Sequence, residues 1–315
     1  MLIGIVLKST GKFYNVLLEN GLEITARIRG KIRLEGLRTT NPVAVGDKVE
    51  LIHEEETTDI YTINSVVPRL NYLVRKSTNL SKQKQILAAN IDRIYLVATV
   101  EQPITQQGFI DRFLVSAEAY RIPVSIIFNK IDLYSEDSKQ KMLFWKDTYE
   151  KIGYACHFVS TFEAETYSFL KEELKDKQVL FAGNSGVGKS SLVKCIDPKI
   201  DLRIGNISDA HHMGKHTTTF AEMFPVQSGG YIIDSPGIRA FGLTDMDKEE
   251  IAHYFPEMRK LLGQCKFHNC LHINEPRCAV KEAVEDGEID EIRYINYLQM
   301  IEDQEDDIHR RNDYA

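Results

Sequence analysis

The sequence predicts a multidomain protein in which a small barrel of short strands is followed by an α/β domain and then by a mainly helical segment. Three patterns in the 315 residues predict this order. Short strand patterns separated by turn residues fill residues 1–70. From about residue 86, nearly continuous apolar runs alternate with helical patterns, and beyond residue 239 the chain is acidic and helical around a cysteine cluster. We therefore expect domains at 1–70, 71–238 and 239–315.

The first domain is predicted to be a closed β-barrel of the OB-fold type. Four segments combine β-branched residues with loose alternation, namely Leu2–Lys8, Phe13–Leu18, Glu23–Ile28 and Lys48–His53. Glycine and asparagine turns separate them. About five short strands in this length favour a small barrel over an open sheet.

A basic cluster lies among these strands and is opposed only by Glu35. It consists of Arg27, Arg29, Lys31, Arg33 and Arg38. One interpretation is a solvated loop. The other is an RNA-binding surface, because clustered basic side chains displace counterions from a nucleic-acid backbone. The net charge of −7 argues against a general nucleic-acid coat protein, so any RNA binding would be local.

The second domain is predicted to contain a mainly parallel sheet covered by helices. Apolar runs typical of strands buried on both faces are Ile91–Val100, Ile122–Phe128, Val179–Ala182 and Tyr231–Ile233. Helical patterns between them cover Phe109–Tyr120, Ser135–Ile152 and a segment that begins near Lys189. This alternation is typical of a three-layer α/β domain.

A phosphate-binding loop follows one of these strands. The motif G-x-x-x-x-G-K-[ST] is complete in Gly183, Asn184, Ser185, Gly186, Val187, Gly188, Lys189 and Ser190, with Ser191 next in the helix. The glycines let successive backbone N–H groups face phosphate oxygens, and the helix N-terminus adds partial positive charge. We expect Lys189 to bridge the β- and γ-phosphates and the Ser190 hydroxyl to ligate Mg²⁺.

A guanine-recognition motif follows another buried strand. The motif N-K-x-D consists of Asn129, Lys130, Ile131 and Asp132. The aspartate can accept two N–H bonds from guanine, which adenine cannot supply, so adenine would leave a carboxylate unpaired. Ser160 and Thr161 occupy the place of a weaker second guanine-contact loop.

Two further segments are expected to meet the metal ion and the γ-phosphate. Asp234 and Gly237 form a D-x-x-G motif after the strand at Tyr231–Ile233. The aspartate would reach Mg²⁺, usually through water, and the glycine N–H would meet the γ-phosphate. Three threonines precede this motif, and we favour Thr218 as the second Mg²⁺ ligand.

The order of these motifs is unusual, because N-K-x-D precedes the phosphate loop. Circular permutation explains this order simply. In a parallel sheet all the nucleotide loops emerge at the carboxyl ends of the strands, so moving the chain break leaves the site intact. The sequence thus predicts a circularly permuted P-loop GTPase domain whose chain leaves the γ-phosphate motif directly into the last domain.

The cysteine cluster predicts a structural zinc site. Cys265, Cys270, His272 and Cys278 supply three thiolates and an imidazole, which suit one tetrahedral Zn²⁺. His268 is the alternative imidazole ligand, and unligated buried thiols are the alternative to a metal site. Four protein ligands would leave no open position for catalysis.

The final helix is predicted to bury one apolar stripe. Its members are Ile289, Ile292, Ile295, Leu298 and Ile301.

The permuted motif order followed by this cysteine–histidine spacing closely resembles the RsgA (YjeQ/YloQ) family of small-subunit-dependent bacterial GTPases. The resemblance covers nearly the whole chain. It implies GTP hydrolysis to GDP and phosphate, stimulated by the small ribosomal subunit during its late maturation. It also implies binding of rRNA and of Mg²⁺ with GTP. We expect a cytoplasmic monomer that is not integral to a membrane.

The resemblance implies a catalytic role for His216. Ras-like GTPases place a glutamine directly after D-x-x-G, whereas this chain has Ile238, which cannot orient water. His216 lies beside the threonines and is the nearest candidate, although it could instead only contact rRNA or phosphate. Two alternatives to the whole interpretation remain: a permuted GTPase of the large subunit, and a nucleotide-gated rRNA-binding adaptor in which hydrolysis is incidental.

Overall fold

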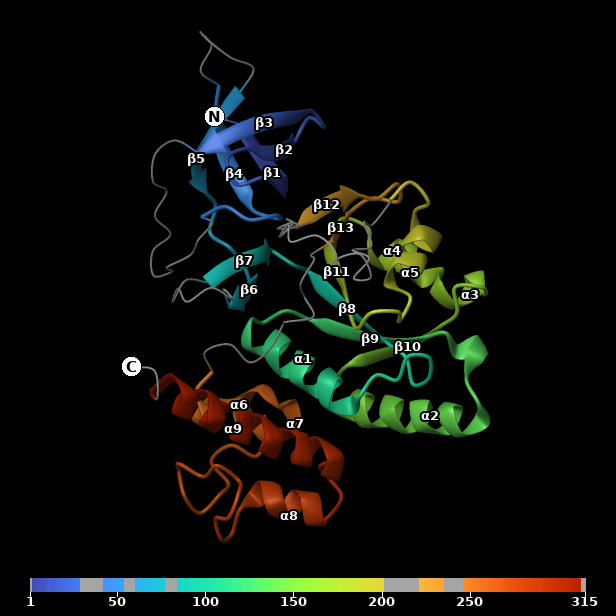
Figure 1. The fold of residues 1–315 in the computed structure, drawn as a ribbon, viewed down its shortest axis with the longest axis vertical. Helices are drawn as coiled ribbons and strands as arrows, with labels where there is room; N and C mark the ends of the chain where they lie inside the picture. Colours follow the sequence, from blue (N-terminus) through green and yellow to red (C-terminus); the bar gives the residue numbers. More distant parts are fainter. Residues whose placement is uncertain are drawn as a thin grey trace.

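The structure is a computed structural model that describes residues 2–28, 42–53, 60–76, 84–200, 221–234 and 246–312. Its elements form three groups along the chain: a barrel, an α/β sheet with helices on both faces, and a helical C-terminal group (Figure 1).

The N-terminal strands form the closed barrel that the sequence predicts. They are β1 (Leu2–Ser9), β2 (Tyr14–Leu18), β3 (Glu23–Ile28), β4 (Lys48–Ile52) and β5 (Ile60–Val66). The strand order is β1-β2-β3-β5-β4, and pairing of β1 with β4 closes the barrel. Alternate residues such as Val16 and Leu51 fill its interior, where both are fully buried.

The central sheet places its parallel strands side by side. They are β8 (Arg93–Ala98), β9 (Val124–Asn129), β10 (Ala155–Val159), β11 (Gln178–Ala182) and β13 (Tyr231–Asp234). The order is β10-β9-β8-β11-β13, followed by the antiparallel β12 (Glu222–Pro225). The α/β prediction is therefore confirmed, and β12 is an addition to it.

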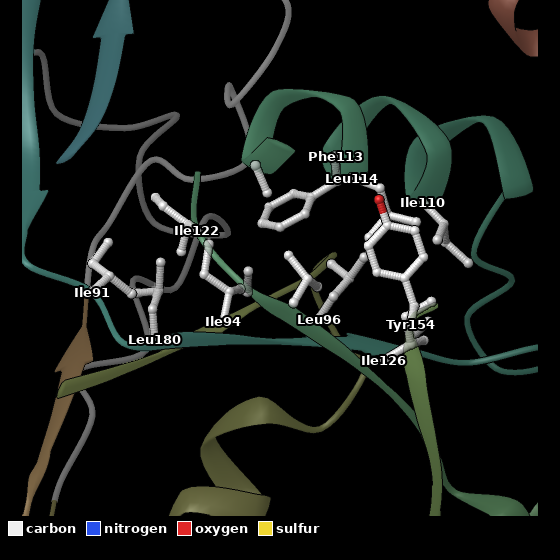
Figure 2. Close-up of a cluster of buried hydrophobic side chains, with 14 of the residues drawn as sticks. Ile91, Ile94, Leu96, Ile110, Phe113, Leu114, Ile122, Ile126, Tyr154 and Leu180 are labelled. Atoms are coloured by element: carbon white, nitrogen blue, oxygen red, sulfur yellow. The ribbon is translucent and has the colours of Figure 1, made fainter. Parts of the chain in front are cut away.

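Helices cover both faces of this sheet because its strands are apolar on both sides. Ile94 and Leu96 of β8 pack in one core with α1 (Gln107–Ala119) and α2 (Glu136–Lys151), as Figure 2 shows for α1. Tyr95 of β8 faces the opposite core. That core includes residues from α4 (Phe169–Glu173) and α5 (Lys189–Ile196), and α3 (Ala164–Tyr167) lies beside it.

The barrel and the central sheet share one continuous set of strands. Strand β12 pairs with β1 at Lys8↔Glu222, which joins the two into an eleven-stranded arrangement. The β1–β2 register shifts between Val6 and Lys8, as at a β-bulge. Val6, just before this irregularity, packs into the barrel core, and Leu7, within it, packs into the α/β core. Strand β1 thus belongs to both domains.

A two-stranded hairpin connects the barrel to the α/β sheet. It consists of β6 (Tyr72–Lys76) and β7 (Lys84–Ala89), and the sequence patterns did not predict it. An isolated parallel bridge between Val45 and Ala88 fixes it against the end of the barrel.

The C-terminal group consists of short helical turns and one long helix. They are α6 (Lys248–Ile251), η4 (Ala252–Tyr254), α7 (Pro256–Arg259), α8 (Ala279–Glu285) and α9 (Glu291–Asn312), while η1 (Ile131–Leu133) lies in the central domain.

The predicted apolar stripe on the final helix is wrong in part. Ile289 and Ile301 are buried, but Ile292 and Ile295 are 46% and 42% exposed. A repeat of three residues falls short of the 3.6-residue turn, so such a stripe winds around the helix. The buried face instead carries Arg293 together with Asn296, Tyr297 and Met300.

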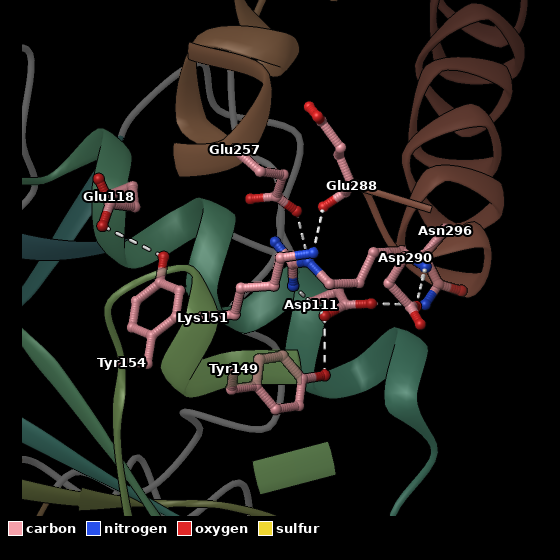
Figure 3. Close-up of polar contacts among 10 residues, drawn as sticks. Asp111, Glu118, Tyr149, Lys151, Tyr154, Glu257, Glu288, Asp290 and Asn296 are labelled. Carbon is pink, nitrogen blue, oxygen red and sulfur yellow. Dashed lines mark hydrogen bonds and ion pairs between the residues drawn. The ribbon is translucent and has the colours of Figure 1, made fainter. Parts of the chain in front are cut away.

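Arg293 anchors the C-terminal group to α1 through a buried ion-pair network (Figure 3). Its guanidinium contacts Asp111 of α1 and Glu257 of α7. Asp111 also accepts hydrogen bonds from Asn296 of α9 at 2.6 Å and from Tyr149 of α2 at 2.8 Å. Buried charges are tolerated when they are paired in this way, so the network fixes α9 against the central domain.

Candidate nucleotide-binding site and metal centre

The predicted nucleotide motifs converge on one edge of the central sheet. Strands β9, β10, β11 and β13 run parallel, so the segments that follow them emerge together at their carboxyl ends. Within the described residues these segments are the N-K-x-D motif, the Ser160–Thr161 loop and the phosphate loop, and Asp234 itself ends β13.

The phosphate loop lies between β11 and α5 and is held close to its neighbours by glycine. A Cβ on Gly183 would approach the Val97 carbonyl oxygen to 2.1 Å, and one on Gly188 would approach Asn129 Nδ2 to 2.3 Å. Both glycines also have positive φ angles, of 138° and 96°. No larger residue fits either position, which explains the glycine spacing of the motif.

Lys189 begins α5 and reaches back across the loop. Its Nζ donates to the carbonyl oxygens of Gly183 at 2.9 Å and Asn184 at 2.6 Å. Ser185 and Gly186 at the loop tip are exposed, whereas Val187 is buried and anchors the loop. Backbone N–H groups and an ammonium at a helix N-terminus can hold phosphate oxygens. The remaining predicted contacts, Ser190 and Ser191, lie in the first turn of α5.

Asn129 joins the base-recognition motif to the phosphate loop. Its buried side chain donates from Nδ2 to the Val187 carbonyl oxygen at 2.8 Å. Lys130 has a left-handed backbone conformation, with φ at 63°, and donates from Nζ to the Gln102 carbonyl oxygen at 2.8 Å. Ile131 is partly buried, and Asp132 is exposed and open to a ligand. The two motifs are therefore parts of one site.

The loop after β8 forms a further wall that the sequence argument did not include. Its members Gln102 and Glu101 contact Lys130 within the N-K-x-D motif and Ser135 after it, respectively. This loop also follows a parallel strand, so the same rule that placed the other motifs could have found it.

Tyr134 holds the N-K-x-D motif through buried hydrogen bonds. Its hydroxyl donates to the Asn129 carbonyl oxygen at 2.8 Å and accepts from the Val100 N–H at 2.8 Å. Burial raises the pKa of Tyr134 to about 12, so the phenol stays protonated and able to donate. A buried tyrosine after the motif gave no sequence signal for this role.

The Ser160–Thr161 loop contacts the helix that follows the phosphate loop. The Ser160 N–H donates to Thr166 Oγ1 at 3.0 Å, and the Ser160 hydroxyl accepts from the Phe162 N–H. The Thr161 carbonyl oxygen lies 3.7 Å from the Sγ of Cys195 on α5. This contact packs the loop against α5, and its role in guanine contact stays a prediction.

Asp234 ends β13 close to the phosphate loop. Burial raises its pKa to about 6, nearby Glu222 adds to the rise, and the Lys189 ammonium opposes it. Carboxylate and hydroxyl oxygens are the donors that Mg²⁺ prefers, so Asp234 and Ser190 fit the predicted metal site. Three predicted residues, Thr218, His216 and Gly237, lie outside the described residues.

The predicted zinc ligands converge in the C-terminal group. The Nδ1 of His272 lies 3.6, 3.4 and 3.3 Å from the Sγ atoms of Cys265, Cys270 and Cys278, and Cys265 and Cys278 Sγ lie 4.0 Å apart. A tetrahedral Zn²⁺ with ordinary bond lengths requires about 3.8 Å between sulfurs and about 3.5 Å from sulfur to nitrogen. These four side chains therefore fit one Zn²⁺ with no open position.

Glu275 and two tyrosines hold the chain between these ligands. The Glu275 carboxylate accepts from the N–H groups of Leu271, Ile273 and Asn274 at 2.7, 2.9 and 3.1 Å. Tyr294 and Tyr297 of α9 donate to the carbonyl oxygens of His272 and Leu271, both at 2.6 Å. Outer contacts of this kind orient metal ligands.

The predicted RNA-binding surface is represented by one side chain. Arg27 is exposed on β3 of the barrel. Arg29, Lys31, Arg33 and Arg38 lie outside the described residues. The structure also contains, within those described ranges, no helix long and apolar enough to cross a bilayer.

The phosphate and base motifs form one site on a parallel sheet, and their order along the chain is permuted. These features define a circularly permuted P-loop GTPase with an N-terminal barrel and a C-terminal cysteine–histidine cluster. Family models agree: the RsgA GTPase model matches residues 66–244, and the RsgA N-terminal domain model matches residues 3–60. The chain belongs to the RsgA family and is a GTP hydrolase.

Relatives and solved structures match over nearly the full length. A protein of Bacteroides fragilis named "Small ribosomal subunit biogenesis GTPase RsgA" is 50% identical over 307 residues, covering 98% of both chains. A Flavobacterium psychrophilum protein of the same name is 47% identical, covering 99% of this chain and 95% of its own. The crystal structure of YjeQ from Thermotoga maritima has a TM-score of 0.79 and 37% identity, covering 96% and 98%.

The crystal structure of YloQ, a circularly permuted GTPase, has a TM-score of 0.75 at 30% identity. The match covers 97% of this chain and 96% of YloQ. The permutation inferred from motif order therefore agrees with a similar fold.

Proposed function

We propose that this chain hydrolyses GTP to GDP and phosphate, that the small ribosomal subunit stimulates the reaction, and that it acts in late maturation of that subunit in the cytoplasm. The observation that supports the site is the bond between Asn129 and Val187, which joins guanine and phosphate recognition. The names of the relatives, which refer to small-subunit biogenesis, support the partner.

In this proposal different residues of the chain bind different parts of the nucleotide. Asp132 selects guanine, with Ser160 and Thr161 beside it, and the phosphate loop with Lys189 holds the phosphates. Ser190 and Thr218 would hold Mg²⁺, Asp234 would reach it through water, and the Gly237 N–H would meet the γ-phosphate. When bound, the metal ion would neutralise developing charge on the phosphates. The basic residues that include Arg27 bind rRNA phosphates.

Two further roles complete the proposal. Cys265, Cys270, His272 and Cys278 hold one structural Zn²⁺, because four protein ligands leave no place for substrate. His216 orients the attacking water, because Ile238 cannot do so. The protein acts as a monomer.

The test is GTP turnover with and without purified small subunits. We expect stimulation by the subunit, and we expect His216→Ala to lower the stimulated kcat by about 10- to 1,000-fold with little change in GTP affinity. His211→Ala, a histidine five residues earlier, is the matched control and should retain the stimulated rate.

The same measurement addresses the alternative functions. If no subunit stimulates turnover but the protein binds small subunits in a GTP-dependent way, the rRNA-binding adaptor is favoured. Stimulation by large subunits alone would favour a large-subunit GTPase.

A further inference from the structure

Three charged residues lie in a row across the strands that join the barrel to the nucleotide site. Lys8 of β1 is the register partner of Glu222 in β12, and Glu222 is the register partner of Asp234 in β13. Residues directly opposite each other in antiparallel strands project to the same side of a sheet. The row therefore leads from the barrel to the end of β13.

The first two members of this row form an ion pair. Lys8 Nζ lies 2.9 Å from Glu222 Oε2, and each side chain is 31% exposed. By itself such a partly exposed pair contributes little to stability, on the order of 0–1 kcal/mol. A role in folding alone would therefore make it nearly dispensable.

The second and third members repel each other. Glu222 and Asp234 are like charges directly opposite in an antiparallel pair, an arrangement that is ordinarily destabilising. Lys8 offsets this repulsion from the barrel side, and Lys189 of the phosphate loop lies close enough to Asp234 to act from the other side. The charge at Glu222 thus bears directly on Asp234.

The backbone of β1 is irregular next to the contact between Lys8 and Glu222. The register shift between Val6 and Lys8 marks a bulge, and bulges re-aim the side chains beside them. Leu7 at this shift packs into the α/β core, which fixes β1 against β12. Lys8 is therefore presented to Glu222 by a strand embedded in both domains.

We propose that Lys8 and Glu222 set the Mg²⁺ affinity of the nucleotide site through Asp234, so that the barrel controls how firmly bound nucleotide keeps its metal ion. This inference rests on the proposed function, in which Asp234 serves the Mg²⁺ site. In this inference Glu222 is a positioning residue, because it acts through Asp234, its register partner. Its negative charge strengthens the attraction for Mg²⁺, and Lys8 moderates that charge.

The test measures the dissociation rate of a fluorescent GDP from the full-length protein as a function of Mg²⁺ concentration. Glu222→Gln removes a negative charge and should raise the half-saturating Mg²⁺ concentration about two- to tenfold. A change of this size is expected for the loss of one nearby charge that water partly screens. Lys8→Met leaves Glu222 uncompensated and should lower it by a similar factor. Lys12→Met, in an exposed turn of the barrel, is the matched control and should leave it unchanged.

A charge swap separates this role from a structural one. Lys8→Glu combined with Glu222→Lys restores an ion pair but places a positive charge beside Asp234. The half-saturating Mg²⁺ concentration should then rise above that of Glu222→Gln. If the swap instead restores the unaltered value, the pair serves only to hold the strands and the inference is overturned.

Asp234→Asn distinguishes failure of this inference from failure of the proposed function. Suppose that Asp234→Asn shifts the Mg²⁺ dependence. If Lys8→Met and Glu222→Gln then leave it unchanged, or both shift it in the same direction, only the inference fails. If Asp234→Asn also has no effect, Asp234 does not serve the metal ion and both fail.

Discussion

Asp132 is exposed at the end of a well-anchored motif, which makes it a selective recognition group. Asn129 and Lys130 are hydrogen-bonded to neighbouring loops, whereas the Asp132 side chain is exposed and can meet a base. An aspartate accepts from the N1–H and exocyclic amine of guanine, and this pattern is absent from adenine.

Asp132→Asn should weaken GTP binding and shift preference toward xanthine nucleotides. The new amide can donate to the xanthine C2 carbonyl, which the carboxylate cannot. Competition binding with GTP, XTP and ATP measures the shift, and Asp137→Asn on the exposed first turn of α2 is the control. Equal binding of ATP and GTP by the unaltered protein would contradict the assignment.

The Tyr134 hydroxyl forms hydrogen bonds with two buried backbone groups. Tyr134→Phe should leave the Asn129 carbonyl and the Val100 N–H without their partner, at a cost of about 1–3 kcal/mol in the free energy of unfolding. Because the lost contacts hold the N-K-x-D motif, GTP affinity should also fall. Urea unfolding and nucleotide titration check the two effects.

Tyr231→Phe is the control for that experiment, because Tyr231 lies only partly buried at the start of β13, at the opposite end from Asp234. A loss of stability with unchanged GTP affinity in Tyr134→Phe would mean that the tyrosine supports the fold without positioning the motif.

At the scale of elements, we expect the C-terminal loop that carries the proposed zinc ligands to depend on metal for its shape. Cys270→Ala or His272→Ala should release about one Zn²⁺ per chain and loosen residues 240–315, because metal binding supplies folding free energy in small metal sites. GTP binding should largely survive. Metal analysis and hydrogen exchange give the two readouts, and Cys156→Ala in β10 is the thiol control.

Local patterns predicted most elements, because a strand or helix depends chiefly on its own periodicity. Four of the barrel strands, four of the central parallel strands and the phosphate loop were found in this way, whereas β5 and β10 were not among the predicted strands. The final helix was misjudged because its buried face includes the charged Arg293, whose partner Asp111 lies 182 residues away in sequence. A periodicity argument treats such a residue as solvent-facing.

The site was likewise predicted where motifs are contiguous and missed where contacts are distant. Gln102 acts through a backbone carbonyl, and any residue type supplies one, so composition gave no signal. The β1–β12 pairing is also invisible locally, since it joins strands more than 200 residues apart.

At the scale of the whole molecule, the Arg293 network ties the C-terminal group to α1. Arg293→Met should destabilise this docking by about 3–5 kcal/mol, because it leaves the carboxylates of Asp111 and Glu257 buried without their cation. Hydrogen exchange across α9 measures the loss. Arg259→Met is the control, because the Arg259 and Glu118 side chains are 49% and 26% exposed and such a pair contributes about 0–1 kcal/mol.

Comparable exchange in both variants would mean that apolar packing alone docks the helix. That packing includes Val115 of α1 against Tyr297 and Met300 of α9.

The joined sheet also determines what the barrel protects. Without β1, strand β12 would be the outermost strand of the central sheet, with its outer N–H and C=O groups open to any extended segment. Uncovered edges of this kind recruit strands from other chains and promote aggregation. The barrel therefore does for the central sheet what a capping repeat does for a solenoid: it closes the end of a structure that would otherwise continue to add strands.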